Sequence, residues 1–193
     1  MKAKQQTAKI ATISMLTAIS VVLYYLEFPI LPSASHLKLD LSDIPALFAG
    51  IVFGPVSAVV IELLKNFIEF ISKGLGSQMG FGNLMNFIVG VAYILPFSLT
   101  YKKLKQKGSG ISKSLIIASV LGTISILIFG FLGNYIIAPL YYSIFLQTEL
   151  TDAVLWAAIS SATILNVIKG IMLSIVSFPL VSVLLKRFNK ISF

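Results

Sequence analysis

Lys169 and Asn166 are the two residues of this sequence that point most directly to a chemical role. Both fall within the apolar run Val154–Leu185, and Lys169 stands near its middle. A lysine at the centre of a membrane-spanning helix costs about 2.5–3.5 kcal/mol on insertion scales and normally faces the protein interior. A spacing of three residues puts both side chains on one helical face. The pair suits a polar ligand; the alternative is a structural lysine paired with a buried carboxylate.

A second polar stripe consists of Glu62, Lys65, Asn66 and Glu69. Spacings of three and four residues place these side chains on one face of a helix. The stripe either lines a cavity or forms an internal ion pair. Glu69, near the end of its apolar run, is alternatively a solvated residue.

Further asparagines stand at other helix positions. Asn83 and Asn86 follow a glycine-rich segment, and Asn134 stands alone among apolar residues. Asn83 fits a helix cap, whereas Asn86 lies almost a turn further in. Because an amide offers both donor and acceptor groups, Asn134 is expected to bind a ligand or a neighbouring helix.

Catalytic and metal-binding motifs are missing from the sequence. His36 is the only histidine, there is no cysteine, and no GxSxG, HExxH or Walker-type motif occurs. A lone histidine cannot supply the repeated ligands of a zinc site, so His36 is interpreted as a solvated loop residue. We assign no catalytic residue, metal or cofactor, and expect binding of a polar organic molecule rather than an enzyme.

The composition indicates an all-α membrane protein. The 193 residues are 57% hydrophobic and 11% charged, with a mean hydropathy of +0.95. Soluble domains typically carry about 25% charged residues, and the period-two alternation of barrel strands is absent. We expect a single domain over residues 1–193. The net charge of +8 lies in short clusters between apolar runs, so it indicates membrane topology and not nucleic-acid binding.

The basic clusters predict six transmembrane helices. Most of the 15 Lys and Arg residues lie near the N-terminus, between residues 102 and 113, and near the C-terminus. The positive-inside rule puts all three clusters, and hence both termini, in the cytoplasm. Six crossings meet this requirement if Gly54-Pro55 divides the run Ile44–Ile71. The predicted helices are 10–28, 43–53, 55–72, 84–101, 114–139 and 153–185.

Two of these helices need comment. The first follows a basic segment, as a signal peptide would, but its apolar run is long for a signal core and we expect it to be retained. The second is too short to span a bilayer at 1.5 Å per residue. Either its start extends into the preceding loop, or neighbouring helices shelter it.

Small residues form a stripe along the first predicted helix. They recur every three or four residues and share one face: Thr7, Ala11, Ser14 and Ala18. Such stripes allow another helix to approach closely. The stripe packs either within the chain or against a partner subunit.

Several segments resemble one protein family. LDLSDIPALFAGIVFGP followed by IELLKNF, GNLMNFIVGVAYILPFSLTYKK and LNVIKGIMLSIV resemble the riboflavin-specific S component of energy-coupling factor (ECF) vitamin transporters. The resemblance covers most of the chain. It implies a six-helix bundle in the bacterial plasma membrane that captures riboflavin on its extracellular side. It also implies a coupling membrane subunit and two cytoplasmic ATPases as partners, with riboflavin as transported ligand and not as cofactor.

The same resemblance implies a set of substrate-binding residues from the first loop and the later helices: Leu39, Leu41, Asp43, Asn86, Asn134, Asn166 and Lys169. The chain departs from the family at Asn83, where glutamate is common. The Ala-x-x-x-Ala docking pattern of the family is diluted to Thr7/Ala11 and Ser14/Ala18. The alternatives are an S component for another vitamin or precursor, and a membrane enzyme that uses Glu62 or Asp43 as an acid or base.

Overall fold

The computed structural model describes residues 2–30, 38–73, 80–147 and 150–187, and these are almost entirely helical. The described residues form six α-helices: α1 Lys2–Tyr25, α2 Asp43–Val52, α3 Pro55–Lys73, α4 Phe81–Gln106, α5 Ile111–Leu140 and α6 Asp152–Arg187. A π-helical segment, η3 (Tyr141–Leu146), continues α5. Two short antiparallel strands, β1 (Phe28–Pro29) and β2 (Lys38–Leu39), follow α1.

The expected all-α class is confirmed apart from one short strand pair, and each predicted range is occupied by one helix. The largest difference is in α1, which begins at Lys2 and not at residue 10, and ends at Tyr25 and not at residue 28. The β1–β2 pair and η3 were not expected from the sequence. His36 lies outside the described residues.

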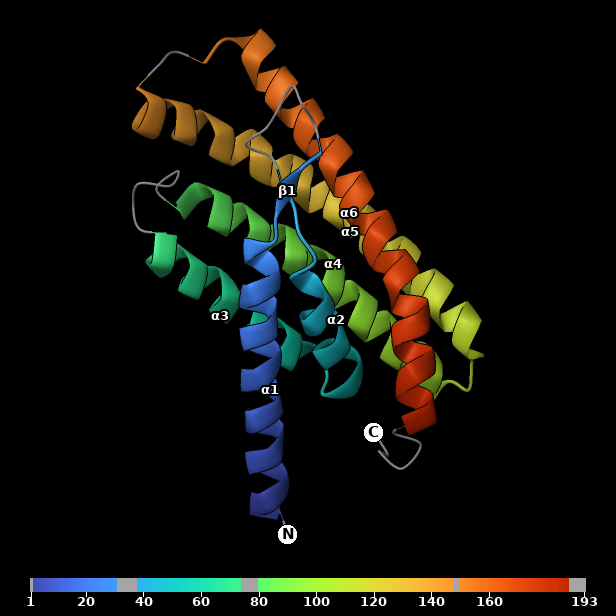
Figure 1. Cartoon of the computed structure of the whole chain (residues 1–193). Coiled ribbons are helices and arrows are strands. Elements are labelled where there is room, and N and C mark those ends of the chain that lie inside the picture. Colours follow the sequence, from blue (N-terminus) through green and yellow to red (C-terminus); the bar gives the residue numbers. More distant parts are fainter. Residues whose placement is uncertain (1, 31–37, 74–79, 148–149, 188–193) are drawn as a thin grey trace.

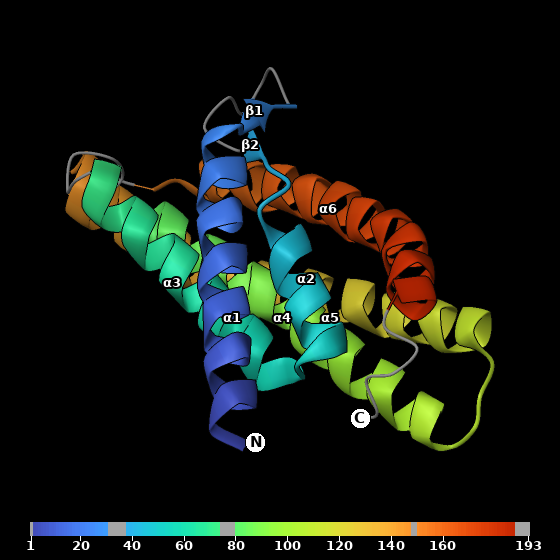
Figure 2. The same ribbon diagram turned by 60° about the horizontal axis from the view of Figure 1, so that its bottom comes forward.

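The helices run between two opposite ends of the molecule (Figures 1 and 2). In both views the start of α1, the α2–α3 turn and the C-terminal ends of α4 and α6 lie toward the lower side. The β1–β2 pair lies toward the upper side. The described basic clusters around residues 9 and 102–113 therefore belong to the end opposite the β1–β2 pair.

Helix α2 is short because Gly54 and Pro55 stop it and start α3. Gly54 has a φ of 93°, a left-handed conformation that costs glycine little, and Pro55 fits the first turn of α3. The predicted break is confirmed. Helix α2 begins at Asp43 without extending into the loop, and it is sheltered: all of its residues except Ile44, Phe48 and Val52 are buried.

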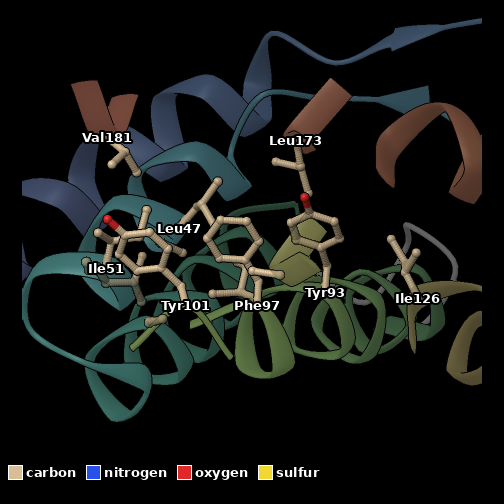
Figure 3. Close-up of a cluster of buried hydrophobic side chains, with 14 of the residues drawn as sticks. Leu47, Ile51, Tyr93, Phe97, Tyr101, Ile126, Leu173 and Val181 are labelled. Atoms are coloured by element: carbon tan, nitrogen blue, oxygen red, sulfur yellow. The ribbon is translucent and has the colours of Figure 1, made fainter. Parts of the chain in front are cut away.

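The hydrophobic core lies between α2, α3, α4, α5 and α6, and Figure 3 shows part of it. Tyr93, Phe97 and Tyr101 stack along one face of α4, with ring centroids 5.8 and 6.3 Å apart. Leu47 of α2 and Leu173 of α6 are fully buried members of the same cluster. This core fixes the distances between the helices that carry the polar residues.

Length and composition identify candidate membrane spans among the described residues: Gln5–Tyr25, Phe81–Gln106, Ile111–Leu146 and Asp152–Val181. Helix α3 has 19 residues, but its buried face is charged. Helix α2 is apolar and too short.

Candidate functional site

A cavity of about 380 Å³ opens between α1, α3, α4, α5, α6 and the segment around β2. Its size falls in the range of roughly 300–1,000 Å³ that is common for small-molecule sites. Part of its wall is apolar, from Met85, Val89, Ala162 and Leu165. Amide and charged side chains supply the rest, so the cavity has the mixed lining expected for a polar organic ligand.

The structure brings the polar residues predicted on the later helices together in this cavity. Asn86 of α4, Asn134 of α5, and Asn166 and Lys169 of α6 all line it. Their convergence depends on the packing of three helices that are distant in sequence.

Lys169 is buried and held by partners on two sides. Its Nζ lies 2.8 Å from Oδ2 of Asp43 and 3.9 Å from Oδ2 of Asp40. It also donates a hydrogen bond of 2.8 Å to Oδ1 of Asn86. The charge in the middle of α6 is therefore paired with a carboxylate, as the structural interpretation expected, and it also faces the cavity, as the ligand interpretation requires.

Gly130 of α5 contacts two of the cavity amides. Its carbonyl accepts a 2.7 Å hydrogen bond from Nδ2 of Asn134, one turn further along the helix. On its other side, a Cβ atom at this position would overlap the amide nitrogen of Asn166. Sequence reasoning missed Gly130, because its contact with Asn166 comes from another helix.

The predicted residues in β2, at the start of α2 and between these two elements lie elsewhere. Leu39 and Asp43 are buried, Leu41 is 38% exposed, and none of them is part of the cavity lining. Asp40 lines the cavity instead. Asp43 acts behind the cavity, where one of its oxygens faces Lys169 and the other pairs with Lys65.

The stripe on α3 forms internal ion pairs behind and beside the cavity. Glu62 and Lys65 are fully buried, and Nζ of Lys65 lies 2.8 Å from Oε2 of Glu62. Glu69 is 3% exposed and pairs with Lys73, so it is not the solvated residue that its position suggested. Asn83 donates to Glu69 from inside α4, whose N-cap is Gly80; the cap interpretation of Asn83 was wrong.

Ion pairs also close the rim of the cavity near the β1–β2 pair. Oε1 of Glu27 accepts hydrogen bonds of 2.7 Å from Lys38 and 3.0 Å from Lys73. Partial burial would raise the pKa of Glu27, but the two lysines outweigh this effect and hold the pKa below its ordinary value. These pairs connect the end of α1, strand β2 and the end of α3.

Tyr24 of α1 is a cavity residue that was not predicted as part of the site. It is buried, lines the cavity, and lies with Thr17 and Ser20 on the inward face of α1. The Nζ of Lys73 sits 5.3 Å from its ring centroid. The spacing of Thr17, Ser20 and Tyr24 was the available signal.

The small-residue stripe of α1 faces away from the rest of the chain. Thr7, Ala11, Ser14 and Ala18 are all exposed. The interpretation as packing within the chain does not fit this placement, and docking of a partner stays a prediction. Among the described residues, no group of three or more His, Cys, Asp or Glu side chains could hold a metal ion.

Comparison with known proteins gives consistent matches along nearly the whole chain. The family model for the ECF transporter, substrate-specific component, matches residues 8–181. The riboflavin transporter FmnP of Bacillus subtilis is 34% identical over 180 residues, which cover 92% of each chain. The riboflavin transporter RibU of Staphylococcus aureus is 34% identical over 173 residues, 89% of this chain and 87% of its own.

A solved structure of the S component of a bacterial ECF transporter has the same fold. It superposes with a TM-score of 0.69 at 34% identity, over 96% of this chain and 99% of that one. With bacterial transporters as relatives and several helices long and apolar enough to span a bilayer, the protein is a multi-pass protein of the bacterial cell membrane. The chain belongs to the family of substrate-specific components of ECF transporters.

Proposed function

We propose that this protein binds riboflavin and delivers it for uptake, as the substrate-capture subunit of an ECF-type transporter. The observation that carries the proposal is the convergence of Asn86, Asn134, Asn166 and Lys169 on one cavity of about 380 Å³. Family membership and relatives that are named riboflavin transporters support the choice of ligand. The matched family is a transport component and not an enzyme.

The chemistry of the cavity fits an uncharged ligand. Lys169 is neutralised by Asp43 inside the protein, so the ligand need not bring a charge. Its hydrogen bond to Asn86 and its contact with Asp43 occupy two of the three donors of an ammonium group. The remaining donor and the amides can pair with the imide-like edge of the flavin ring or with ribityl hydroxyls, while Met85 and Leu165 pack against the ring.

The segment between β2 and α2 is proposed to complete the site. Leu39 and Leu41 reach the ligand only if this segment shifts toward the cavity when the ligand enters. Asp43 is assigned an indirect role, because it holds Lys169 and does not line the cavity.

We further infer that six helices cross the membrane, with both termini in the cytoplasm. The described basic clusters lie toward one end of the helices, away from the β1–β2 pair (Figure 1), as the positive-inside rule expects. Helices α2 and α3 would cross as a sheltered pair, with their charged residues turned inward. The cavity then opens on the extracellular side.

The energy for transport is proposed to come from partners: a coupling membrane subunit and two cytoplasmic ATPases. The exposed stripe of Thr7, Ala11, Ser14 and Ala18 is the proposed docking face for the coupling subunit. Small residues on an exposed helix face would let a partner helix approach closely within the bilayer.

The test of ligand identity is a competition panel. Purified protein is loaded with radiolabelled riboflavin and challenged with unlabelled riboflavin, thiamine, biotin, folate and pyridoxine. Displacement by riboflavin alone supports the proposal. Equal or better displacement by another vitamin would reassign the protein within its family.

A further inference from the structure

A cluster of fully buried charges lies directly behind the cavity. Asp43, Glu62 and Lys65 have no exposed surface, and none of them lines the cavity. Charges at such depth are costly unless they are paired, and removal of one partner leaves an uncompensated charge. Because burying these charges costs free energy, we expect a cluster next to a binding site to have a role beyond the site itself.

Lys65 directs its hydrogen bonds to the segment between β2 and α2. Its Nζ donates to Oδ1 of Asp43 and, at 2.8 Å, to Oγ of Ser42. Glu62, one turn away on the same helix, lies 2.8 Å from the same nitrogen. Within the described residues, however, neither oxygen of Glu62 accepts a hydrogen bond from Lys65 or any other group, and Oδ2 of Asp43 likewise meets Lys169 only as an ion pair. The directed contacts of Lys65 thus cross from α3 to the loop and the start of α2.

Ser42 and Asp43 connect Lys65 to the cavity. The second oxygen of Asp43 faces Lys169 at 2.8 Å. Ser42 donates its backbone N–H, at 2.8 Å, and its hydroxyl to Oδ1 of Asp40. The other oxygen of Asp40 lies 3.9 Å from Lys169. Both carboxylates beside Lys169 are therefore held through contacts that end on Lys65.

We propose that Lys65 is a positioning residue for ligand binding, which sets the place of Lys169 in the cavity through Asp43 and Ser42. This inference rests on the proposed function. Lys65 itself touches no ligand; without it, Asp43 keeps only Lys169 as a cationic partner and the start of α2 loses its anchor on α3.

The competing explanation is that Lys65 merely neutralises Glu62. Glu62 packs tightly against α4, since a Cβ atom at Gly90 would lie 2.5 Å from its Oε2, and it cannot move far to find water. The two explanations differ in what happens when both members of the pair are removed. Replacing Lys65 and Glu62 together keeps the balance between buried acids and bases, but it does not restore the anchor on Asp43.

The experiment compares Lys65→Met, Glu62→Gln and the double variant with the native protein. Riboflavin affinity is measured by quenching of flavin fluorescence, and thermal unfolding is followed in the same preparations. The Lys65→Met change is expected to lower affinity at least about tenfold, as for loss of a charge-assisted contact. Glu62→Gln retains the Lys65–Asp43 contact, so its affinity should stay within about threefold of native, less than a neutral hydrogen bond is worth.

The double variant decides between the explanations. We expect its unfolding temperature to return toward the native value while its affinity stays low, with an altered visible absorption spectrum of the bound flavin. Native affinity in the double variant would overturn the positioning role and leave Lys65 as a partner of Glu62. Should the Lys65 variants fail to fold, Ser42→Ala tests the same link, and native affinity in that variant would also overturn it.

The native protein in the same titration separates this inference from the proposed function. If it binds no riboflavin, both fall. If it binds and every variant binds equally well, only the positioning role falls.

Discussion

Lys169 and Asp43 form an ion pair of 2.8 Å between the middle of α6 and the first residue of α2. The pair joins the longest helix of the chain to the segment beside the cavity. It explains how a lysine can stand at membrane depth, since its charge is neutralised and its nitrogen still faces the cavity.

Replacing Lys169 by Met should weaken riboflavin binding at least about tenfold, because a charge-assisted hydrogen bond is worth about 1.5–3 kcal/mol. Fluorescence titration of the purified variant measures the change. Lys102→Met, an exposed lysine at the end of α4, is the matched control and should bind as the native protein does. Native affinity with lowered stability in Lys169→Met would assign the lysine a purely structural role.

Gly130→Ala should also weaken binding, by about tenfold, the value of one displaced hydrogen bond of roughly 1–1.5 kcal/mol. The added methyl group overlaps the amide of Asn166 and pushes it out of place. Gly110→Ala is the control, because a Cβ atom there meets nothing within 4 Å. Equal affinities in the two variants would mean that Asn166 does not need its present position.

Much of this arrangement could be predicted from the sequence, and the reason is the cost of charge in apolar surroundings. Gly54-Pro55 indicated the break between α2 and α3. The free-energy cost of burying Lys169 predicted either a ligand or a carboxylate partner. The helices follow from long apolar runs that permit few other structures.

The parts that could not be predicted depend on distant contacts. The roles of Asp40 and Asp43 depend on which carboxylate oxygen faces Lys65 or Lys169. The direction in which successive side chains of this short segment point decides these contacts. Gly130 matters because Asn166 arrives from another helix, which no local pattern records.

Acid should weaken the ion pairs at the rim of the cavity and lower the folding stability, because it protonates Glu27. Although partial burial opposes them, Lys38 and Lys73 hold the pKa of Glu27 in the folded protein below its ordinary value. The contribution of Glu27 to folding stability is therefore complete above the ordinary carboxyl pKa. It is lost as the pH falls through the lower pKa of the folded protein. Because the pairs are partly exposed, the contribution should be at most about 1 kcal/mol.

Thermal unfolding at a series of pH values from 6 to below 4 measures this contribution. The native protein should lose more stability toward acid than the Glu27→Gln variant, which has no carboxylate to protonate. Parallel curves of stability against pH for the two proteins would show that Glu27 does not contribute to the pH dependence of folding stability.

Ala11→Leu should disrupt assembly with the coupling subunit without changing riboflavin affinity. Ala11 is exposed on the small-residue stripe, and overpacking a tight interface costs about 1–3 kcal/mol. We expect the yield of complex in co-purification to fall about tenfold. Gln5→Leu, at an exposed position of α1 about a third of a turn away from Ala11, should leave the complex intact; equal losses in both variants would argue against a specific docking face.

A riboflavin titration of the purified native protein, followed by quenching of flavin fluorescence, tests whether the cavity binds riboflavin. We expect saturable quenching at one riboflavin per chain, and much weaker binding when Asn166 and Lys169 are replaced together by Ala and Met. Absence of saturable quenching in the native protein, or unchanged binding in that double variant, would contradict the assignment of this cavity as a riboflavin site.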